Sequence, residues 1–357
     1  MLAHDFRRIV AVAVTAEARG RKSAAEILED ARLVFEPTYR EIVGSLPERI
    51  ARIGGYHIGW WDAHGLPMNG GGKVIRPALV LTTTAALSTG PADAARERAV
   101  AAAVAVEMVH DFSLLHDDIM DGDRTRRDRP TAWAQFGHSA AMLTGDLFLT
   151  VAMDVLAAQD TVAVQILSRA LRALCAGQSE DLSFENRQTV SLSECVRMAE
   201  GKTAALLGAS CELGAWAAGA DSDRLQTMRQ FGLHLGLAYQ LVDDLLGIWG
   251  DPSLTGKPIH ADLARRKKSL PVVAALNSAT PASAELASRY ADPEPLDPTE
   301  QAHLARLIER AGGRDWAEHT ARENCAIARR ILEHARPEPG AAADLLSLVD
   351  LITHRDR

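Results

Sequence analysis

Two clusters of carboxylates within apolar sequence constrain this 357-residue chain more than any other feature. The first reads Asp117-Asp118-Ile119-Met120-Asp121, and the second is the pair Asp243-Asp244 far downstream. Carboxylates this close together repel one another, and each costs free energy to remove from water. Divalent metal ions at the two clusters are the simplest way to offset that cost.

The spacing of apolar residues predicts an all-α fold, a single large helical bundle. Helices are expected over 24–53 with a break at 45–47, over 77–87, 94–118, 140–158, 162–183, 191–218 and 223–249, from 270, from 299, and over 316–334 and 341–352. Segments 54–72, 122–130 and 250–268 are expected to be loops, and no β-hairpin signature is found. The bundle domain is expected over 24–357. Residues 1–23 are expected to be a flexible or short helical extension.

Composition excludes several classes of protein. A net charge of −8 argues against nonspecific nucleic-acid binding. The four cysteines have no metal-binding spacing and are expected to be reduced core thiols. No apolar run is judged to reach transmembrane length, and the short apolar stretch 9–14 only imitates a signal peptide. A cytoplasmic protein without stable membrane insertion is expected.

Cationic and polar residues recur at intervals along the chain. A glycine run, 70–72, precedes Lys73 and Arg76; each such feature alone is also typical of an ordinary loop. The others are Arg126-Arg127, Lys202-Thr203, Gln240 on the same helical face as Asp243, Asp244 and Gly247, and finally Lys257 and Lys267. Asp117 and Asp121 share one helical face with Asp118 beside them, and the apolar residues around them argue against a solvated acidic face.

In this order the motifs resemble those of the trans-isoprenyl diphosphate synthase (polyprenyl synthetase) family over roughly residues 25–350. The resemblance implies an isoprenoid-synthase bundle with a central cavity faced by both aspartate motifs, usually in a homodimer. It implies head-to-tail (1'-4) condensation of isopentenyl diphosphate with allylic diphosphates, as in the short-chain geranylgeranyl and farnesyl diphosphate synthases.

The resemblance also assigns roles to individual residues. Three Mg²⁺ ions are expected, with Asp117, Asp118, Asp121, Asp243 and Asp244 as the metal site. Isopentenyl diphosphate is expected on Lys73, Arg76, His110 and Arg127. The allylic diphosphate is expected on Arg126, Lys202, Thr203, Gln240, Lys257 and Lys267, with Lys202, Thr203 and Gln240 assisting catalysis. Phe112 and Ser113 are expected to limit chain length, with geranylgeranyl diphosphate as the product and farnesyl diphosphate second.

One departure from the family pattern concerns the second motif. The family usually has Asp-Asp-x-x-Asp, but the fifth position here is Gly247, and Asp244 or Asp251 are the candidates to compensate. Two rival functions stay open: a class I terpene cyclase, and a non-catalytic partner subunit. A cyclase would need a metal-binding triad late in the chain, and this sequence does not have one. Silent partner subunits typically lose an aspartate motif, whereas only one acid is missing here.

Overall fold

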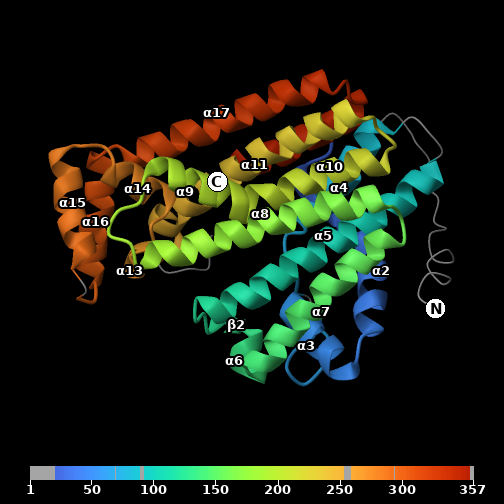
Figure 1. The fold of residues 1–357 in the computed structure, drawn as a ribbon, viewed down its shortest axis with the longest axis horizontal. Helices are drawn as coiled ribbons and strands as arrows, with labels where there is room; N and C mark the ends of the chain where they lie inside the picture. The colour runs from blue at the N-terminus through green and yellow to red at the C-terminus, as the bar shows by residue number, and fades with distance from the viewer. Residues whose placement is uncertain (1–20, 69, 89–91, 253–258, 293, 354–357) are drawn as a thin grey trace. The chain divides into compact units, whose positions relative to one another are not determined.

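The computed structural model describes residues 21–68, 70–88, 92–252, 259–292 and 294–353, which are mostly helical (Figure 1). The helices are α2 (Ala24–Gly44), α3 (Glu48–Ile58), α4 (Ile75–Leu87), α5 (Ala92–Met120), α6 (Ala132–Phe136), α7 (His138–Ala157), α8 (Thr161–Glu185), α9 (Leu192–Ala199), η2 (Glu200–Ala204), α10 (Ala205–Ala217), α11 (Ser222–Trp249), α13 (Ala261–Ala264), α14 (Leu270–Leu276), α15 (Pro281–Ala291), α16 (Pro298–Arg310), α17 (Gly313–His334) and α18 (Pro339–Thr353). The all-α prediction is confirmed. Two short strands, β1 (Thr125–Arg126) and β2 (Arg129–Pro130), pair antiparallel, so the expectation of no hairpin was wrong there.

Contacts divide the chain into two compact units, each built from several stretches of sequence. The first unit comprises Met1–Arg169, Ala209–Arg229 and Leu332–Leu348, and the second comprises Ala170–Gly208, Gln230–Ile331 and Val349–Arg357. The first aspartate motif belongs to the first unit and the second motif belongs to the second unit.

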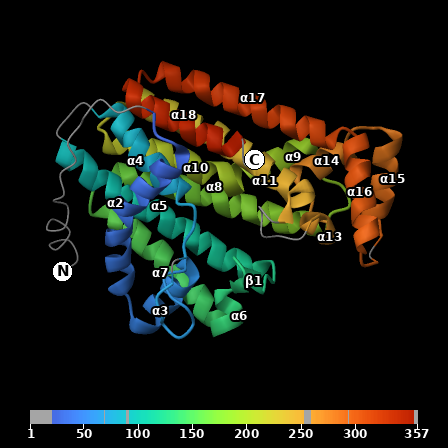
Figure 2. The same ribbon diagram turned by 180° about the vertical axis from the view of Figure 1, so that it is seen from behind.

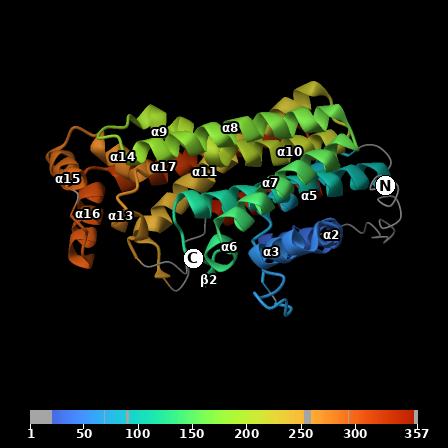
Figure 3. The same cartoon turned by 60° about the horizontal axis from the view of Figure 1, so that its bottom comes forward.

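Helix α5 is the buried centre of the first unit. From Ala99 to Val109 its side chains are almost completely buried, and most of them are alanine or valine. Small side chains let neighbouring helices approach closely, and α4 and α7 both pack against α5. Figure 3 shows α7 beside α5. Helix α2 contacts α4 and α5 (Figure 2). The prediction of a central buried helix over 94–118 is confirmed, with two more residues at each end.

The core of the second unit joins α11 to the short helices around it. Leu241 of α11, Leu270 of α14 and Cys195 of α9 belong to one fully buried cluster. A second buried cluster contains Ile248, close to the end of α11, and Leu263 of α13. This packing fixes the last turns of α11, which carry the second aspartate motif, against α13 and α14.

The segment predicted as one helix over 191–218 is divided in three. Helix α9 begins after Ser191, whose hydroxyl accepts a hydrogen bond from Glu194 N while the Glu194 side chain bonds back to Ser191 N. A π-helical turn, η2, then separates α9 from α10. Such turns are rare and frequently lie at functional sites, and this one carries Lys202 and Thr203.

Two described helices, α5 and α7, are long and apolar enough to cross a membrane, contrary to the sequence-based expectation that no run reaches that length. In α5, 78% of the apolar window is buried inside the protein, as in the core helix of a globular fold. In α7 the buried share is 33%, so α7 has an apolar outer face. Two helices that meet this criterion are weak evidence of a membrane protein.

Candidate active site

The first aspartate motif forms the C-terminal end of α5. Asp123 N donates to the carbonyl of Asp118 at 2.9 Å, and Gly122 N donates to the carbonyl of Ile119 at 3.4 Å. Gly122 has φ 66°, so these bonds form the usual glycine-capped helix end. Asp117 and Asp118 therefore lie at the negative end of the helix dipole, which disfavours anions. This placement increases the need for a cation beside them.

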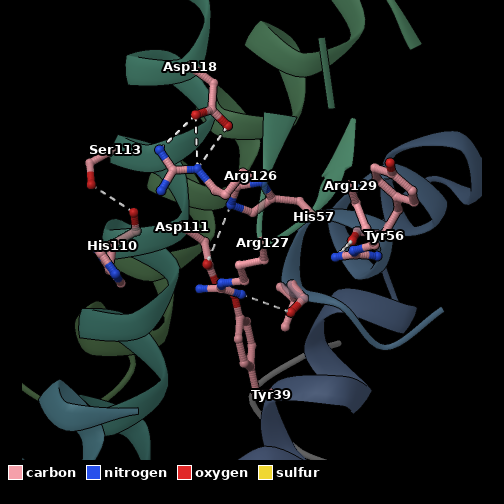
Figure 4. A network of polar contacts seen from close by, with 11 residues as sticks. Tyr39, Tyr56, His57, His110, Asp111, Ser113, Asp118, Arg126, Arg127 and Arg129 are labelled. Carbon is pink, nitrogen blue, oxygen red and sulfur yellow. Dashed lines mark hydrogen bonds and ion pairs between the residues drawn. The ribbon is translucent and has the colours of Figure 1, made fainter. Parts of the chain in front are cut away.

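Asp118 is held by a guanidinium. This residue is 1% exposed, Arg126 Nη2 donates to Oδ1 at 2.7 Å, and Arg126 Nε donates to Oδ2 at 3.2 Å (Figure 4). Burial opposes the charged form of Arg126, but its hydrogen bond with Asp118 and the nearby charges of Asp117 and Asp123 raise its pKa above the usual value. Asp118 thus fixes Arg126 beside the motif.

The β1–β2 hairpin positions Arg126 and Arg127 together. Arg126 pairs with Arg129 across the hairpin, and the two residues of the turn have left-handed backbones, with φ 51° at Arg127 and 59° at Asp128. Two successive left-handed residues are typical of a type I′ turn, which normally favours Asn-Gly. Asp128 tolerates this conformation, whereas Arg127 does not favour it, so the local backbone strain is at Arg127.

Two arginine side chains lie close to the glycine run before α4. A Cβ on Gly71 would lie 2.5 Å from Nη1 of Arg32, and one on Gly72 would lie 3.0 Å from Nη2 of Arg127. Arg32 Nη2 also donates to the carbonyl of Gly72 at 2.7 Å. Arg32 was not predicted from the sequence, because it lies 40 residues before this loop on α2 and has no local motif.

Lys73 and Arg76 flank the start of α4. Val74 is the N-cap residue with a left-handed backbone, φ 46°, and the helix begins at Ile75, two residues before the predicted start at Pro77. A helix N-terminus presents amide groups that favour anions, so these two cations add to an existing preference.

The charges around His110 favour the binding of an anion. Burial lowers the pKa of His110 well below its usual value, and the charges of Arg76, Arg127 and Arg126 lower it further. Burial raises the pKa of Glu107 to about 8, the charge of Asp111 adds to this, and the arginines only partly oppose it. At neutral pH this region thus combines several guanidinium groups with an uncharged imidazole and a protonated carboxyl, an arrangement suited to a polyanion.

A buried polar network lies next to these cations (Figure 4). The Tyr39 hydroxyl donates to Asp111 Oδ2 at 2.6 Å, and His57 Nε2 lies 3.6 Å from Asp111 Oδ1. Tyr39 is 1% exposed, and burial raises its pKa well above the usual value. The network connects α2 and α3 to α5. It was not predicted from the sequence, since its members are separated along the chain and have no common spacing.

In the second unit, Asp244 is part of a hydrogen-bonded chain. Thr203 Oγ1 donates to Gln240 Oε1 at 2.5 Å, and Gln240 Nε2 donates to Asp244 Oδ1 at 2.7 Å. The backbone N–H of Leu270 donates to the other oxygen, Oδ2, at 2.9 Å. Asp244 is 3% exposed, and burial raises its pKa to about 6. The predicted residues Thr203, Gln240 and Asp244 are therefore brought together.

Two lysines of the second unit lie among carboxylates. Lys202 Nζ is 2.7 Å from Asp181 Oδ2. Burial opposes the charged form of Lys267, but the charges of Asp262, Asp244, Asp181 and Asp243 outweigh it and raise the pKa of Lys267. Asp181 and Asp262 were not predicted from the sequence. Lys257, predicted for the allylic diphosphate, lies outside the described residues.

The chemistry of the aspartates suits Mg²⁺, which prefers carboxylate oxygens and usually completes its coordination with water and substrate phosphates. Within the described residues, no three His, Cys, Asp or Glu side chains lie close enough together to hold a metal ion by themselves. The carboxylates crowded at the end of α5, Asp117 and Asp121 among them, fit a Mg²⁺ ion that takes its remaining ligands from water and phosphate oxygens.

The family model of the polyprenyl synthetases matches residues 66–308. The chain belongs to this family. Over 337 residues it is 42% identical to the (2E,6E)-farnesyl diphosphate synthase of Mycobacterium tuberculosis, covering 92% of each chain. It is 43% identical over 336 residues to a geranylgeranyl diphosphate synthase of the same organism, covering 92% of this chain and 93% of the other. The crystal structure of a polyprenyl synthetase from Streptomyces coelicolor A3(2) superposes with a TM-score of 0.87 and 41% identity, covering 92% and 99% of the two chains.

These similarities confirm the predicted family, its all-α fold and the activity of a short-chain trans-prenyltransferase. Two relatives of nearly equal identity carry different product names, so similarity alone leaves the product length unresolved.

The residues predicted to limit chain length lie on α5 of this polyprenyl synthetase, next to α7. Phe112 is 8% exposed, and its ring packs edge-to-face against His116 at 4.7 Å between centroids. A Cβ on Gly145 of α7 would lie 2.6 Å from the His116 ring and 3.5 Å from Phe112. The Ser113 hydroxyl donates to the carbonyl of His110 at 2.7 Å. Phe112 is thus held in place between two helices.

Proposed function

We propose that this enzyme condenses isopentenyl diphosphate with allylic diphosphates in a Mg²⁺-dependent 1'-4 reaction that ends at geranylgeranyl diphosphate. The observation that supports it most is in the first unit, where Arg126 binds Asp118 of the first aspartate motif while the charges of Arg76 and Arg127 act on His110. A carboxylate cluster beside a cation cluster suits a substrate that bears both metal ions and phosphate oxygens.

Isopentenyl diphosphate would be held by Lys73, Arg76, His110 and Arg127. The guanidinium groups would donate paired hydrogen bonds to phosphate oxygens. His110 would act as a neutral hydrogen-bonding group, since burial and the nearby arginines keep it uncharged. Holding this diphosphate fixes the double bond close to the allylic carbon that it attacks.

The residues proposed for the allylic diphosphate are Arg126, Lys202, Thr203, Gln240, Lys257 and Lys267. Asp117 and Asp121 would hold two Mg²⁺ and Asp243 a third; when bound, the metal neutralises the diphosphate as the C–O bond breaks. Lysine and arginine side chains stabilise the same developing charge. The departing diphosphate then accepts the proton whose loss restores a double bond, so no protein base is required.

The paired aspartates would have different tasks. Asp118 and Asp244, predicted as metal ligands, have both carboxylate oxygens engaged by protein donors. We infer that Asp118 orients Arg126 and that Asp244 orients Gln240, while Asp117 and Asp243 are directed to the metal.

The proposed C20 product depends on Phe112 and Ser113. The large ring of Phe112, held by His116 and α7, would stop the growing chain beyond this length, and Ser113 leaves space beside it. A homodimer in the cytoplasm, without stable membrane insertion, is also proposed. The apolar face of α7 supports the dimer, because Met142 and Leu143 are 46% and 58% exposed and a second copy would cover them.

The test is to incubate purified protein with Mg²⁺, isopentenyl diphosphate and each allylic primer in turn, and to size the products. We expect an all-trans C20 diphosphate. A hydrocarbon or alcohol released from one allylic substrate would instead indicate a terpene cyclase. No product from any primer would indicate a silent partner subunit. Size-exclusion chromatography with light scattering would test the dimer.

A further inference from the structure

We propose that Arg32 of α2 is a positioning residue for isopentenyl diphosphate. It holds the backbone of the glycine run, residues 70–72, and thereby fixes where Lys73 and Arg76 emerge at the start of α4. The inference rests on the proposed function, which assigns these two cations to that diphosphate. It extends the site to a helix that none of the recognised motifs includes.

Arg32 reaches the glycine run directly. Its Nη2 donates to the carbonyl of Gly72 at 2.7 Å. A Cβ on Gly71 would lie 2.5 Å from Nη1 of the same guanidinium, so Arg32 lies against the backbone of two successive residues. A charged donor makes a stronger hydrogen bond than a neutral one. The bond therefore ties the loop to α2, although the two are 40 residues apart in the sequence.

Other elements close in on the same short loop. A Cβ on Gly70 would lie 2.7 Å from the carbonyl oxygen of Gly59, the residue that caps α3 with φ 103°. A Cβ on Gly72 would lie 3.0 Å from Nη2 of Arg127, on the β1–β2 hairpin. The glycine run is thus enclosed by α2, the end of α3 and the hairpin, and its position depends on all three.

The residue after Lys73 shows why the loop has to be held. Val74 is the N-cap of α4 and has a left-handed backbone, φ 46° and ψ 34°. This conformation is strained for a β-branched residue and persists only where the surrounding structure imposes it. Burial holds the Val74 side chain, which is 6% exposed, and Arg32 holds the backbone two residues earlier. Without Arg32, Val74 can relax, and Lys73 then leaves the backbone in another direction.

Arg32 has a rigid support. On the same helix, Phe35 and Tyr39 are almost completely buried, and the Tyr39 hydroxyl donates to Asp111 of α5 at 2.6 Å. Glu36 Oε2 lies 3.6 Å from Arg32 Nη1 and steadies the guanidinium from the next turn of α2. The loop is therefore bonded to a helix that is itself fixed on the core of the first unit.

Arg32 also lies beside the cations proposed for the substrate. Together with Gly72, Glu107 and Arg127 it lines one small cavity. Burial raises the pKa of Glu107, and the charge of Arg32 opposes the rise together with those of Arg76 and Arg127. Loss of Arg32 would thus be felt at the proposed isopentenyl diphosphate site.

Two substitutions of similar length separate the hydrogen bond from the bulk of the side chain. Arg32→Met removes the donor, and Arg32→Lys keeps one. Arg32→Met should weaken binding of isopentenyl diphosphate by about ten-fold, measured by calorimetry without an allylic substrate. This is the lower end for a charged donor, because the Arg32 side chain is 30% exposed. Arg32→Lys should bind within about three-fold of the wild type. In turnover, the KM for isopentenyl diphosphate should rise while the KM for the allylic primer stays within about two-fold.

The matched control is Arg40→Met, which removes the same charge from the same helix. Arg40 shares the partner Glu36, with Nη2 2.5 Å from Oε1, but its guanidinium lies over the ring of Trp60. This variant should bind isopentenyl diphosphate like the wild type. Hydrogen exchange of peptides that cover residues 70–76 adds a readout that needs no substrate: exchange should be faster in Arg32→Met and unchanged in Arg40→Met. A Tm close to that of the wild type shows that each variant is folded. Should Arg32→Met unfold, Arg32→Gln replaces it, since its amide is too short to reach the carbonyl.

Three outcomes would overturn the inference. The first is wild-type binding of isopentenyl diphosphate by Arg32→Met. The second is weaker binding with unchanged exchange at residues 70–76, which would mean that Arg32 contacts the ligand without positioning the loop. The third is an equal loss in Arg40→Met, which would indicate a general effect of charge. Failure of the proposed function looks different, because wild-type protein would then form no prenyl diphosphate, while exchange would still report whether Arg32 holds the loop.

Discussion

Glu107 gives a prediction whose sign and size both follow from its surroundings. It lies on α5, is 7% exposed, and its Oε2 is buried with no hydrogen-bond partner among the described residues. Burial and the charge of Asp111 raise its pKa to about 8, and Arg76, Arg127 and Arg32 oppose the rise only partly. At pH 7 the side chain is therefore mostly protonated in the native state and ionised in the unfolded state.

This difference makes the free energy of unfolding depend on pH. Between the unfolded pKa of 4.5 and the native value of about 8, the native state holds a proton that the unfolded state has lost. Stability from this group is thus complete below pH 4.5 and is lost as pH rises towards 8, with a slope of about 1.4 kcal/mol per pH unit. From about pH 6 to about pH 8 the loss is at most about 3 kcal/mol.

Glu107→Gln keeps the shape of the protonated acid and removes its titration. We expect urea denaturation to show a variant whose stability advantage over the wild type grows from pH 6 to pH 8, with Glu41→Gln, at an exposed position of α2, as the control. The contrary result is a variant less stable than the wild type at pH 8. It would mean that Glu107 is ionised and paired with the arginines, and the description of this site as cations around neutral groups would be wrong.

Three further changes test separate parts of the site. Phe112→Ala should lengthen the products beyond C20, as seen by chromatography of the dephosphorylated alcohols, and an unchanged distribution would refute its role. Asp118→Asn should free Arg126, cost about 3 kcal/mol of stability as expected for breaking a buried pair, and raise the allylic KM. Gln240→Ala should leave one oxygen of Asp244 unsatisfied, at a cost of about 1–3 kcal/mol in the urea-derived free energy of unfolding.

The long helices were predictable because the spacing of their apolar residues both indicates a helix and defines the face that packs in the core. Residues 94–118 are apolar on nearly all sides, and a helix of that kind has to be central, as α5 is. Short elements were not predictable in this way. The hairpin around Arg127 and the turn around Asp262 depend on left-handed residues that are not glycine, so the usual turn signals are absent.

The residues of the candidate site also fall into a predictable group and an unpredictable one. Residues inside recognisable motifs, such as Lys73, Gln240 and Asp243, could be assigned a role from their spacing in the sequence. Arg32 and Asp262 were missed, since each reaches a glycine from a different element and contributes through tertiary contact alone. Both contacts left a trace in the sequence, namely a glycine at the position that the side chain reaches. Glycine is too common a residue for that trace to identify the side chain that requires it.

In both aspartate motifs the repulsion between neighbouring carboxylates is relieved in the same way. Neighbouring residues of a helix point about 100° apart, so the two side chains of an Asp-Asp pair leave the helix in different directions. In each motif the second aspartate turns into the protein, where Asp118 meets Arg126 and Asp244 meets Gln240 and the amide of Leu270. A fixed hydrogen-bond donor thereby offsets the charge of the inward acid. Two of these donors, Arg126 and Gln240, belong to the residues proposed to hold the substrate. If the proposed function holds, each doubled aspartate combines one metal ligand with one anchor for the side chains proposed to bind diphosphate.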